Sequence, residues 1–133
     1  MNASELACTE TRPLFSVIVP VLNEARRLPA CLESLRAQTL PRDQVEWLFV
    51  DNGSTDGTVA EVKRLAAADP RVKLIVNARN FGHIRSPLHG MYQAQGAAII
   101  AMASDLQDPP ELIRQFLQRW REGHLIVVGV KPS

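Results

Sequence analysis

The stretch "FSVIVPV", residues 15–21, is a short run rich in β-branched side chains, and its apolar residues are nearly continuous rather than alternating with polar ones. That pattern is typical of a strand that is buried on both faces of a sheet. Comparable apolar runs recur farther along the chain, at residues 45–50, 72–76, 97–103 and 125–130. We therefore predict five strands.

Segments with apolar residues at helical spacing separate these runs. We predict helices at four places: about residues 24–38 with Asn23 as the cap, a segment ending at about Ala68, about residues 87–95 with Pro87 in the first turn, and a segment from Asp108 to Gly123. The alternation of strands and helices predicts the α/β class, as a Rossmann-like, mostly parallel sheet with helices on both faces that ends after the fifth strand.

The composition is that of an ordinary globular chain. The 133 residues suffice for one domain, which we place at residues 15–131 after a polar tail at residues 1–14. A net charge of +1 and an aromatic content of 5% argue against a nucleic-acid partner. Two cysteines, Cys8 and Cys31, no leader-like start and no apolar run near membrane-spanning length predict a cytoplasmic protein.

Polar side chains gather where the predicted strands end. Asn23 and Glu24 follow the first strand, residues 51–56 the second, residues 77–83 the third and residues 105–108 the fourth. In open α/β sheets, ligands bind beyond the carboxyl ends of the strands. We therefore expect a ligand site at this edge of the sheet.

Three common ligand motifs are missing from these loops. No GxGxxG follows the first strand and no GxxxxGK[ST] occurs, so neither a dinucleotide fingerprint nor a P-loop is predicted. The segment "DNGSTDGT", residues 51–58, fails as a calcium-binding loop because Gly57 falls one position too late.

The fourth loop offers two oxygen ligands at close spacing. Side chains two positions apart point the same way in an extended segment, so Asp105 and Gln107 would present two oxygens to one point. A carboxylate and an amide oxygen suit Mg²⁺ or Mn²⁺ better than zinc, with the remaining ligands supplied by phosphates.

Each of these residues also has a purely structural interpretation. Asp105 and Gln107 are equally compatible with being solvated loop residues, and Asp108 before two prolines is typical of a helix cap. Asp51 could accept hydrogen bonds from turn amides, and Asp56 could cap the second helix. The residues alone leave both interpretations open.

Four motifs together resemble the family-2 glycosyltransferases of the GT-A fold: "SVIVPVLNEA", "VDNGSTDGT", "RNFGH" and "SDLQDPPELI", in that order. They span about residues 15–131, and the combination of "PVLNE" with "DLQDPPELI" is the most specific part. The chain looks most like the branch of polyprenyl-phosphate sugar transferases that contains dolichyl-phosphate mannosyltransferase.

The resemblance implies a nucleotide-diphosphate-sugar donor, a divalent cation (Mg²⁺ or Mn²⁺), inversion at the anomeric carbon, and a polyprenyl phosphate or cell-envelope glycan as acceptor. It assigns nucleotide binding to residues of the first three loops: Pro20, Leu22, Asn23, Glu24, Asp51, Arg79 and Asn80. It assigns metal binding to Asp105 and Gln107.

The chain departs from the family pattern in two residues and in length. Ala103 stands where the metal segment usually begins with Asp, so one metal or ribose contact is missing, and Asn52 stands where a second Asp is frequent. Family catalytic domains continue well past 133 residues, and the catalytic Asp of many members lies in that second half. We therefore expect no catalytic residue here, but the donor-binding half of a larger, membrane-associated enzyme, with an exposed sheet edge that promotes self-association.

Two rival functions remain. One is a catalytically silent nucleotide-binding or interaction module of the same fold, which Ala103 and the length of the chain favour. The other is a sugar nucleotidyltransferase, whose Gly-rich loop after the first strand is not matched by "PVLNEARR".

Overall fold

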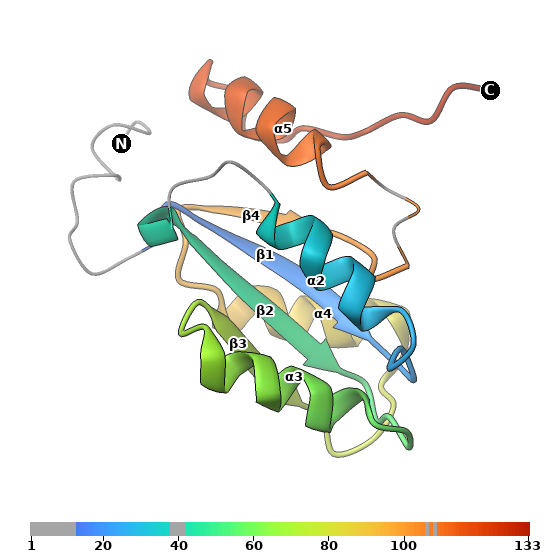
Figure 1. Ribbon diagram of the computed structural model, residues 1–133. Helices are drawn as coiled ribbons and strands as arrows, with labels where there is room; N and C mark the ends of the chain where they lie inside the picture. The colour runs from blue at the N-terminus through green and yellow to red at the C-terminus, as the bar shows by residue number, and fades with distance from the viewer. Residues whose placement is uncertain (1–12, 38–41, 106, 108) are drawn as a thin grey trace.

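A computed structural model describes residues 13–37, 42–105, 107 and 109–133. Its centre is a sheet of four parallel strands, in the order β3-β2-β1-β4. The strands are β1 (Phe15–Val21), β2 (Val45–Asp51), β3 (Val72–Val76) and β4 (Ala98–Ala101). Four of the predicted strands and the α/β class are therefore confirmed (Figure 1).

The predicted fifth strand is wrong. Residues 124–133 pair with no strand of the described chain and lead away from the last helix as an extended segment (Figure 1). Most of their apolar side chains are exposed, at 93% for Leu125 and 88% for Val130, and only Val127 among the residues of this segment is half-buried. An apolar run favours a strand only where a neighbouring strand offers free N–H and C=O groups, and here none lies beside it.

Helices cover both faces of the sheet, as predicted. Figure 1 shows α2 (Leu28–Arg36), α3 (Thr58–Ala68) and α5 (Leu112–Arg121) on one side and α4 (Gly82–Gln93) on the other. Alternate residues of the strands serve the two faces. The larger core contains Val17, Val19 and Phe49 with the first group of helices. The smaller core contains Ile18, Leu48 and Val50, with Met91 and Ala94 packed against them.

Two helices begin elsewhere than predicted. Helix α2 begins at Leu28, and Asn23 is not its cap but adopts a left-handed conformation with φ of 52° in the loop before it. Helix α4 begins at Gly82, five residues before Pro87, so the proline lies inside the helix rather than in its first turn. The helix continues through Pro87 although a proline has no N–H to donate to the carbonyl one turn earlier.

The last helix also starts late. Helix α5 begins at Leu112 with Glu111 in the cap position, and the carbonyl groups of Pro109 and Pro110 accept from Leu112 and Ile113. Asp108, the predicted cap, lies outside the described residues. None of the helices in the described part of the chain is long and apolar enough to cross a bilayer.

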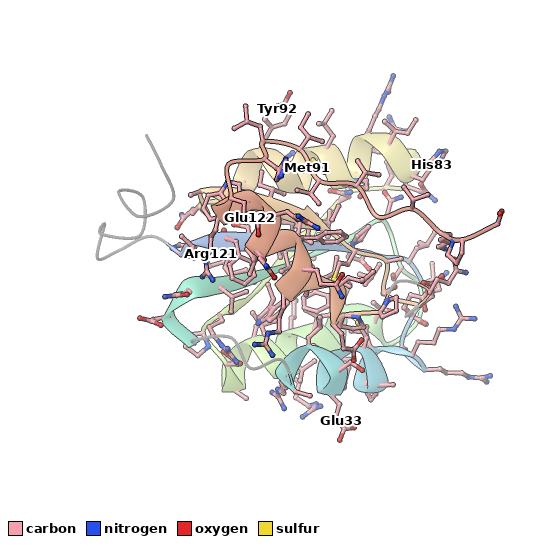
Figure 2. All side chains as sticks on the ribbon, turned by 90° about the horizontal axis from the view of Figure 1, so that it is seen from above. Glu33, His83, Met91, Tyr92, Arg121 and Glu122 are labelled. Carbon is pink, nitrogen blue, oxygen red and sulfur yellow. The ribbon has the colours of Figure 1, made fainter. Side chains whose placement is uncertain are left out.

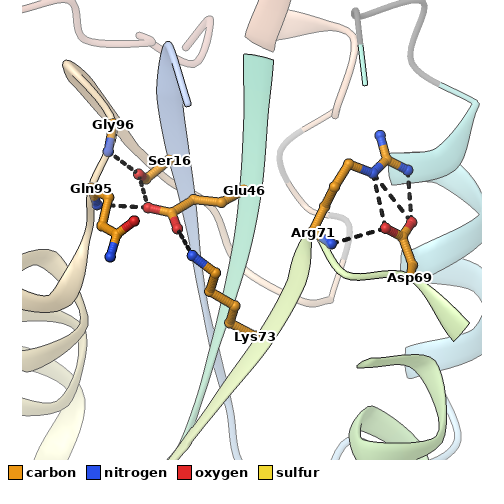
Figure 3. Close-up of polar contacts among 7 residues, drawn as sticks. All are labelled: Ser16, Glu46, Asp69, Arg71, Lys73, Gln95 and Gly96. Atoms are coloured by element: carbon orange, nitrogen blue, oxygen red, sulfur yellow. Dashed lines mark hydrogen bonds and ion pairs between the residues drawn. The ribbon is translucent and has the colours of Figure 1, made fainter. Parts of the chain in front are cut away.

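The amino ends of the strands are joined by a buried carboxylate. Oε1 of Glu46 accepts from the Ser16 hydroxyl at 2.5 Å and the Gln95 backbone N–H at 2.6 Å, and Oε2 accepts from Lys73 at 2.6 Å (Figure 3). Ser16 in turn accepts from the backbone N–H of Gly96. A Cβ at position 96 would lie 2.5 Å from the Phe15 carbonyl carbon, so only glycine fits this contact.

Candidate functional site

The loops after β1 and β2 are tied together at the carboxyl edge of the sheet. The Asn23 carbonyl Oδ1 accepts from the Thr55 backbone N–H at 2.8 Å, and the Asn23 N–H donates to Ser54 Oγ at 2.9 Å. The next backbone N–H, of Glu24, donates to Thr58 Oγ1 at 2.9 Å. These contacts explain the left-handed conformation of Asn23, which turns its backbone and side chain toward the neighbouring loop.

Asp56 has the structural role that the sequence suggested, although one residue before the formal cap position. Its carboxylate accepts from the backbone N–H and the hydroxyl of Thr58, the first residue of α3. The hydroxyl contact is the first reason that the pKa of Asp56 is held below its usual value. Asp56 therefore stays charged at the start of the helix, where a negative charge is favourable.

Asp51 uses one of its two carboxylate oxygens for the turn. Oδ2 accepts from the backbone N–H groups of Gly53 and Ser54, at 3.1 and 3.0 Å, as the structural interpretation predicted. Oδ1 has no partner, and it is the one buried side-chain polar atom without a hydrogen bond among the described residues. Because an unpaired buried oxygen is costly, its presence at this edge marks a position where a ligand N–H or O–H would be stabilising.

The loop after β3 folds onto the loop after β2. The side chain of Asn52 is hydrogen-bonded to Asn80, Phe81 and Gly82. Arg79 lies over the Phe81 ring, 4.4 Å from its centroid, which leaves the guanidinium at the exposed surface of this loop. The three loops that contain the predicted nucleotide-binding residues therefore form one continuous hydrogen-bonded surface.

The fourth loop differs from its prediction. Strand β4 ends at Ala101, and residues 104–105 lie in a turn, so the assumption of an extended segment was wrong. Oδ1 of Asp105 accepts from the Gln107 backbone N–H at 3.1 Å, a contact that folds the carboxylate over its own loop. Asp105 is half-buried and Gln107 is exposed. That their side-chain oxygens bind one cation stays a prediction.

Helix α2 contains a buried thiol, that of Cys31. The pKa of Cys31 is raised to about 11, chiefly by burial and then by the negative charges of Glu24 and Asp105. The negative charges of Glu24 and Asp105 therefore both act on this thiol.

The oxygen donors present fit a hard cation whose shell is completed by a ligand. Asp105 and Gln107 offer a carboxylate and an amide oxygen, the donors that Mg²⁺ and Mn²⁺ prefer. Within the residues described, no three His, Cys, Asp or Glu side chains gather as a ready metal site. Phosphate oxygens would therefore have to supply much of the coordination.

One cavity of about 440 Å³ lies beside these loops, between the end of β3 and the first turns of α4. It is lined by residues of both segments: Val76, Asn77, Ala78, Phe81, Arg85, Ser86 and His89. None of the predicted binding residues lines it.

The sequence did not identify the residues that join the loops. Asn52, Thr55 and Thr58 act between segments that are far apart in the chain. Their residue types, small and capable of hydrogen bonding in turns, were the available signal, but nothing in a single sequence says which loop each will contact.

Comparison with known proteins agrees with the fold. The family model described as "Glycosyl transferase family 2" matches residues 16–133. An uncharacterized glycosyltransferase of Bacillus subtilis, YkcC, is 39% identical over 120 residues, which are 90% of this chain and 37% of that protein. The bactoprenol glucosyl transferase of Shigella phage SfV is 37% identical over 119 residues, 89% of this chain and 39% of that protein. The chain thus spans less than two fifths of either relative.

Solved structures show the same fold. The mannosyltransferase PcManGT from Pyrobaculum calidifontis, in complex with GDP-Man and Mn²⁺, superposes with a TM-score of 0.71 at 26% identity, over 89% of this chain and 37% of that one. Residues 1–349 of S. aureus TarS, in complex with UDP-GlcNAc, give 0.63 at 30% identity, over 68% and 26%.

Proposed function

Because this chain belongs to glycosyl transferase family 2, we propose that the carboxyl edge of its sheet binds the nucleotide diphosphate of a sugar donor. The observation that supports this most directly is the unpaired Oδ1 of Asp51, a buried acceptor at the end of β2. An N–H of the base or a hydroxyl of the ribose would supply the missing donor. The Asp51 side chain is only 1% exposed, so neighbouring groups must move aside for a ligand to reach it.

The loops on either side of Asp51 supply the rest of the nucleotide site. Pro20, Leu22, Asn23 and Glu24 form the wall on the β1 side, and Leu22 keeps 40% of its surface exposed. Arg79 and Asn80 form the wall on the β3 side. The guanidinium of Arg79 gives this wall a positive charge, which suits a diphosphate.

The cation belongs between the diphosphate and the loop after β4. Asp105 and Gln107 would hold Mg²⁺ or Mn²⁺. When bound, such an ion neutralises the diphosphate and makes it a better leaving group. The complex of PcManGT with GDP-Man and Mn²⁺ gives this pairing of donor and metal a precedent in a structural neighbour.

For the whole protein we propose inverting glycosyl transfer to a polyprenyl phosphate or a cell-envelope glycan, with residues 15–131 as its donor-binding half. A relative named bactoprenol glucosyl transferase supports the lipid acceptor. A lipid phosphate is already ionised near neutral pH, so it could attack the anomeric carbon without a protein base.

Calorimetric titration of the chain with UDP, GDP and their sugars, with and without Mn²⁺, tests the proposal. We expect metal-dependent binding that Asp105→Ala abolishes. Glu33→Ala removes an exposed carboxylate that projects outward from α2 and should leave binding unchanged (Figure 2). Absence of binding to every nucleotide would refute the proposed site.

A second function, a catalytically silent nucleotide-binding module, has one observation in its favour. Ala103 replaces a family carboxylate, and Asp105 Oδ1 already accepts a hydrogen bond from its own loop. Binding of nucleotide that is the same with and without Mn²⁺, and unaffected by Asp105→Ala, would favour this module over the metal-dependent enzyme.

A further inference from the structure

We propose that Asn52 is a positioning residue that holds residues 77–82 in the shape required for nucleotide binding, and that this role requires an amide rather than a carboxylate. The expected effect on nucleotide binding rests on the proposed function, because Arg79 and Asn80 lie in the segment that Asn52 holds. Asn52 is not among the residues predicted to bind the nucleotide.

The Asn52 side chain reaches across the gap between two loops. Its Nδ2 donates to Asn80 Oδ1 at 2.9 Å and to the Gly82 carbonyl at 3.3 Å. Its Oδ1 accepts from the Phe81 backbone N–H at 2.9 Å, with Asn77 Nδ2 at 3.4 Å. The side chain is buried, with 8% of its surface exposed, so these groups rather than water satisfy it. One amide thus binds both ends of the segment.

Backbone groups fix the orientation of both amides in this contact. The Phe81 N–H can only donate and the Gly82 carbonyl can only accept, so Oδ1 of Asn52 must face the first and Nδ2 the second. The Gly82 N–H donates to Asn80 Oδ1 at 2.8 Å, which makes that oxygen the acceptor toward Asn52 as well. Neither side chain can flip without losing a backbone partner.

An aspartate at position 52 would keep one half of this contact and destroy the other. A carboxylate still accepts from Phe81, but it has no donor for Asn80 Oδ1 or the Gly82 carbonyl, and it would place an oxygen against both. Aspartate, which is frequent at this position in the family, would therefore lose both contacts that Nδ2 makes in this chain.

The held segment also sits tightly against the turn that contains Asp51. A Cβ at Gly53 would lie 3.1 Å from the Asn80 backbone nitrogen and 3.2 Å from the Arg79 carbonyl carbon. From the other side, Asn77 Nδ2 donates to Ser86 Oγ at 2.8 Å, which connects the loop to α4. Asn52 is therefore the side chain that links the Asp51 turn, the Arg79 loop and, through Asn77, the start of α4.

The test compares Asn52→Asp with wild type in two measurements: the affinity for UDP and GDP, and the hydrogen exchange of the Phe81 and Gly82 amides. We expect Asn52→Asp to weaken nucleotide binding about tenfold, which is about 1.4 kcal/mol, and to speed exchange at both amides. Gln93→Glu makes the same amide-to-acid change at an exposed position of α4 and should alter neither. Asn52→Ala and Asn80→Ala complete a double-mutant cycle, whose affinity losses should be less than additive.

A merely structural role would lower stability without touching affinity. Glu46→Gln, which weakens the fold at the opposite end of the sheet, serves as the reference for a destabilised chain that still binds. Affinity and exchange in Asn52→Asp within twofold of wild type would overturn the proposal. If wild type binds no nucleotide, the proposed function fails, and only hydrogen exchange at the Phe81 and Gly82 amides then tests the role of Asn52. Faster exchange in Asn52→Asp would support the contact between Asn52 and residues 80–82, and unchanged exchange would overturn it.

Discussion

Glu46 and Asp51 are two buried carboxylates at opposite ends of the same strand, β2, with 2% and 1% of their surfaces exposed. Both oxygens of Glu46 are hydrogen-bonded, to Ser16, Gln95 and Lys73 (Figure 3). Asp51 has two backbone partners on Oδ2 and none on Oδ1. The two carboxylates are almost equally buried, but both oxygens of Glu46 are hydrogen-bonded within the protein, whereas Oδ1 of Asp51 has no hydrogen-bond partner.

The difference separates a structural end of the sheet from a binding end. A satisfied carboxylate stabilises the arrangement around it, and removing one partner of such a group is strongly unfavourable. A buried carboxylate oxygen without a hydrogen-bond donor lowers stability, and a bound ligand that donates an N–H or O–H to it removes that cost. Changes at the amino end should therefore affect the free energy of unfolding, and changes at the carboxyl end should affect binding.

The largest effect is expected from Glu46→Ala. The change removes the acceptor shared by the Ser16 hydroxyl and the Gln95 N–H, whereas the Lys73 side chain is 43% exposed and stays solvated. We expect a loss of about 2–4 kcal/mol in the free energy of unfolding. Urea denaturation measures it. Glu46→Gln keeps an oxygen and the side-chain volume, so it should cost less. Equal stability of Glu46→Ala and wild type would remove the distinction between the two ends.

Gly53→Ala is the corresponding change at the carboxyl end, with a smaller cost in stability. Gly53 has φ of +93°, a conformation that costs an alanine about 1–2 kcal/mol, and the new Cβ would press on the backbone of Arg79 and Asn80. We expect UDP or GDP affinity to fall together with stability. Gly57→Ala in the same turn is the matched control, since its Cβ would meet only the Ala25 methyl group at 4.0 Å. Equal effects of the two changes would contradict the close packing at Gly53.

Low pH should reduce the stability that Glu46 contributes at the amino end of the sheet. Burial alone would raise the pKa of Glu46, but the hydrogen bonds from Lys73, Ser16 and Gln95 outweigh it and hold the pKa below its usual 4.5. Folding then favours the charged form, so the contribution to stability is present above pH 4.5 and is lost as the pH falls through the lower pKa of the folded state.

Thermal unfolding from pH 7 to pH 3 checks this. At pH values below 4.5, the melting temperature of wild type should decrease as the pH is lowered. The melting temperature of Glu46→Gln should decrease less steeply with pH. Asp69, whose pKa is lowered by the hydrogen bond from Arg71, contributes in the same direction and should keep part of the slope in the variant. Identical slopes in the two proteins would show that Glu46 is not responsible.

Self-association is the smallest effect that we expect. Helix α4 exposes Ile84, Leu88 and Tyr92 one turn apart, at 68%, 45% and 78%, and Tyr92 projects outward in Figure 2. Exposed apolar side chains in a row favour association. Light scattering at high concentration should give a mass above that of the monomer, and Tyr92→Lys should lower it. A monomer at every concentration would show that this row has no partner in a second copy.

The sequence predicted the sheet better than the contacts around it. The first four strands were visible because each is a short apolar run, and their polar carboxyl ends indicated the edge where the loops meet. The start of α4 was missed because Pro87 suggested a first turn, whereas Gly82 and the contacts of Asn52 with the preceding loop place the start earlier. The run at residues 125–130 was misread because a strand needs a neighbour, which its own residues do not specify.

Whether the carboxyl edge binds nucleotide is tested most directly by a ¹⁵N NMR titration of the chain with UDP and GDP in the presence of Mg²⁺, repeated with Mn²⁺ as a paramagnetic probe. We expect shifts of the amide signals of residues 22–24, 51–54 and 77–82, broadening by Mn²⁺ at Asp105 and Gln107, and unchanged signals at Gln95 and Gly96. Shifts centred on the amino end around Gln95 and Gly96, or no shift with either nucleotide, would contradict binding at the carboxyl edge.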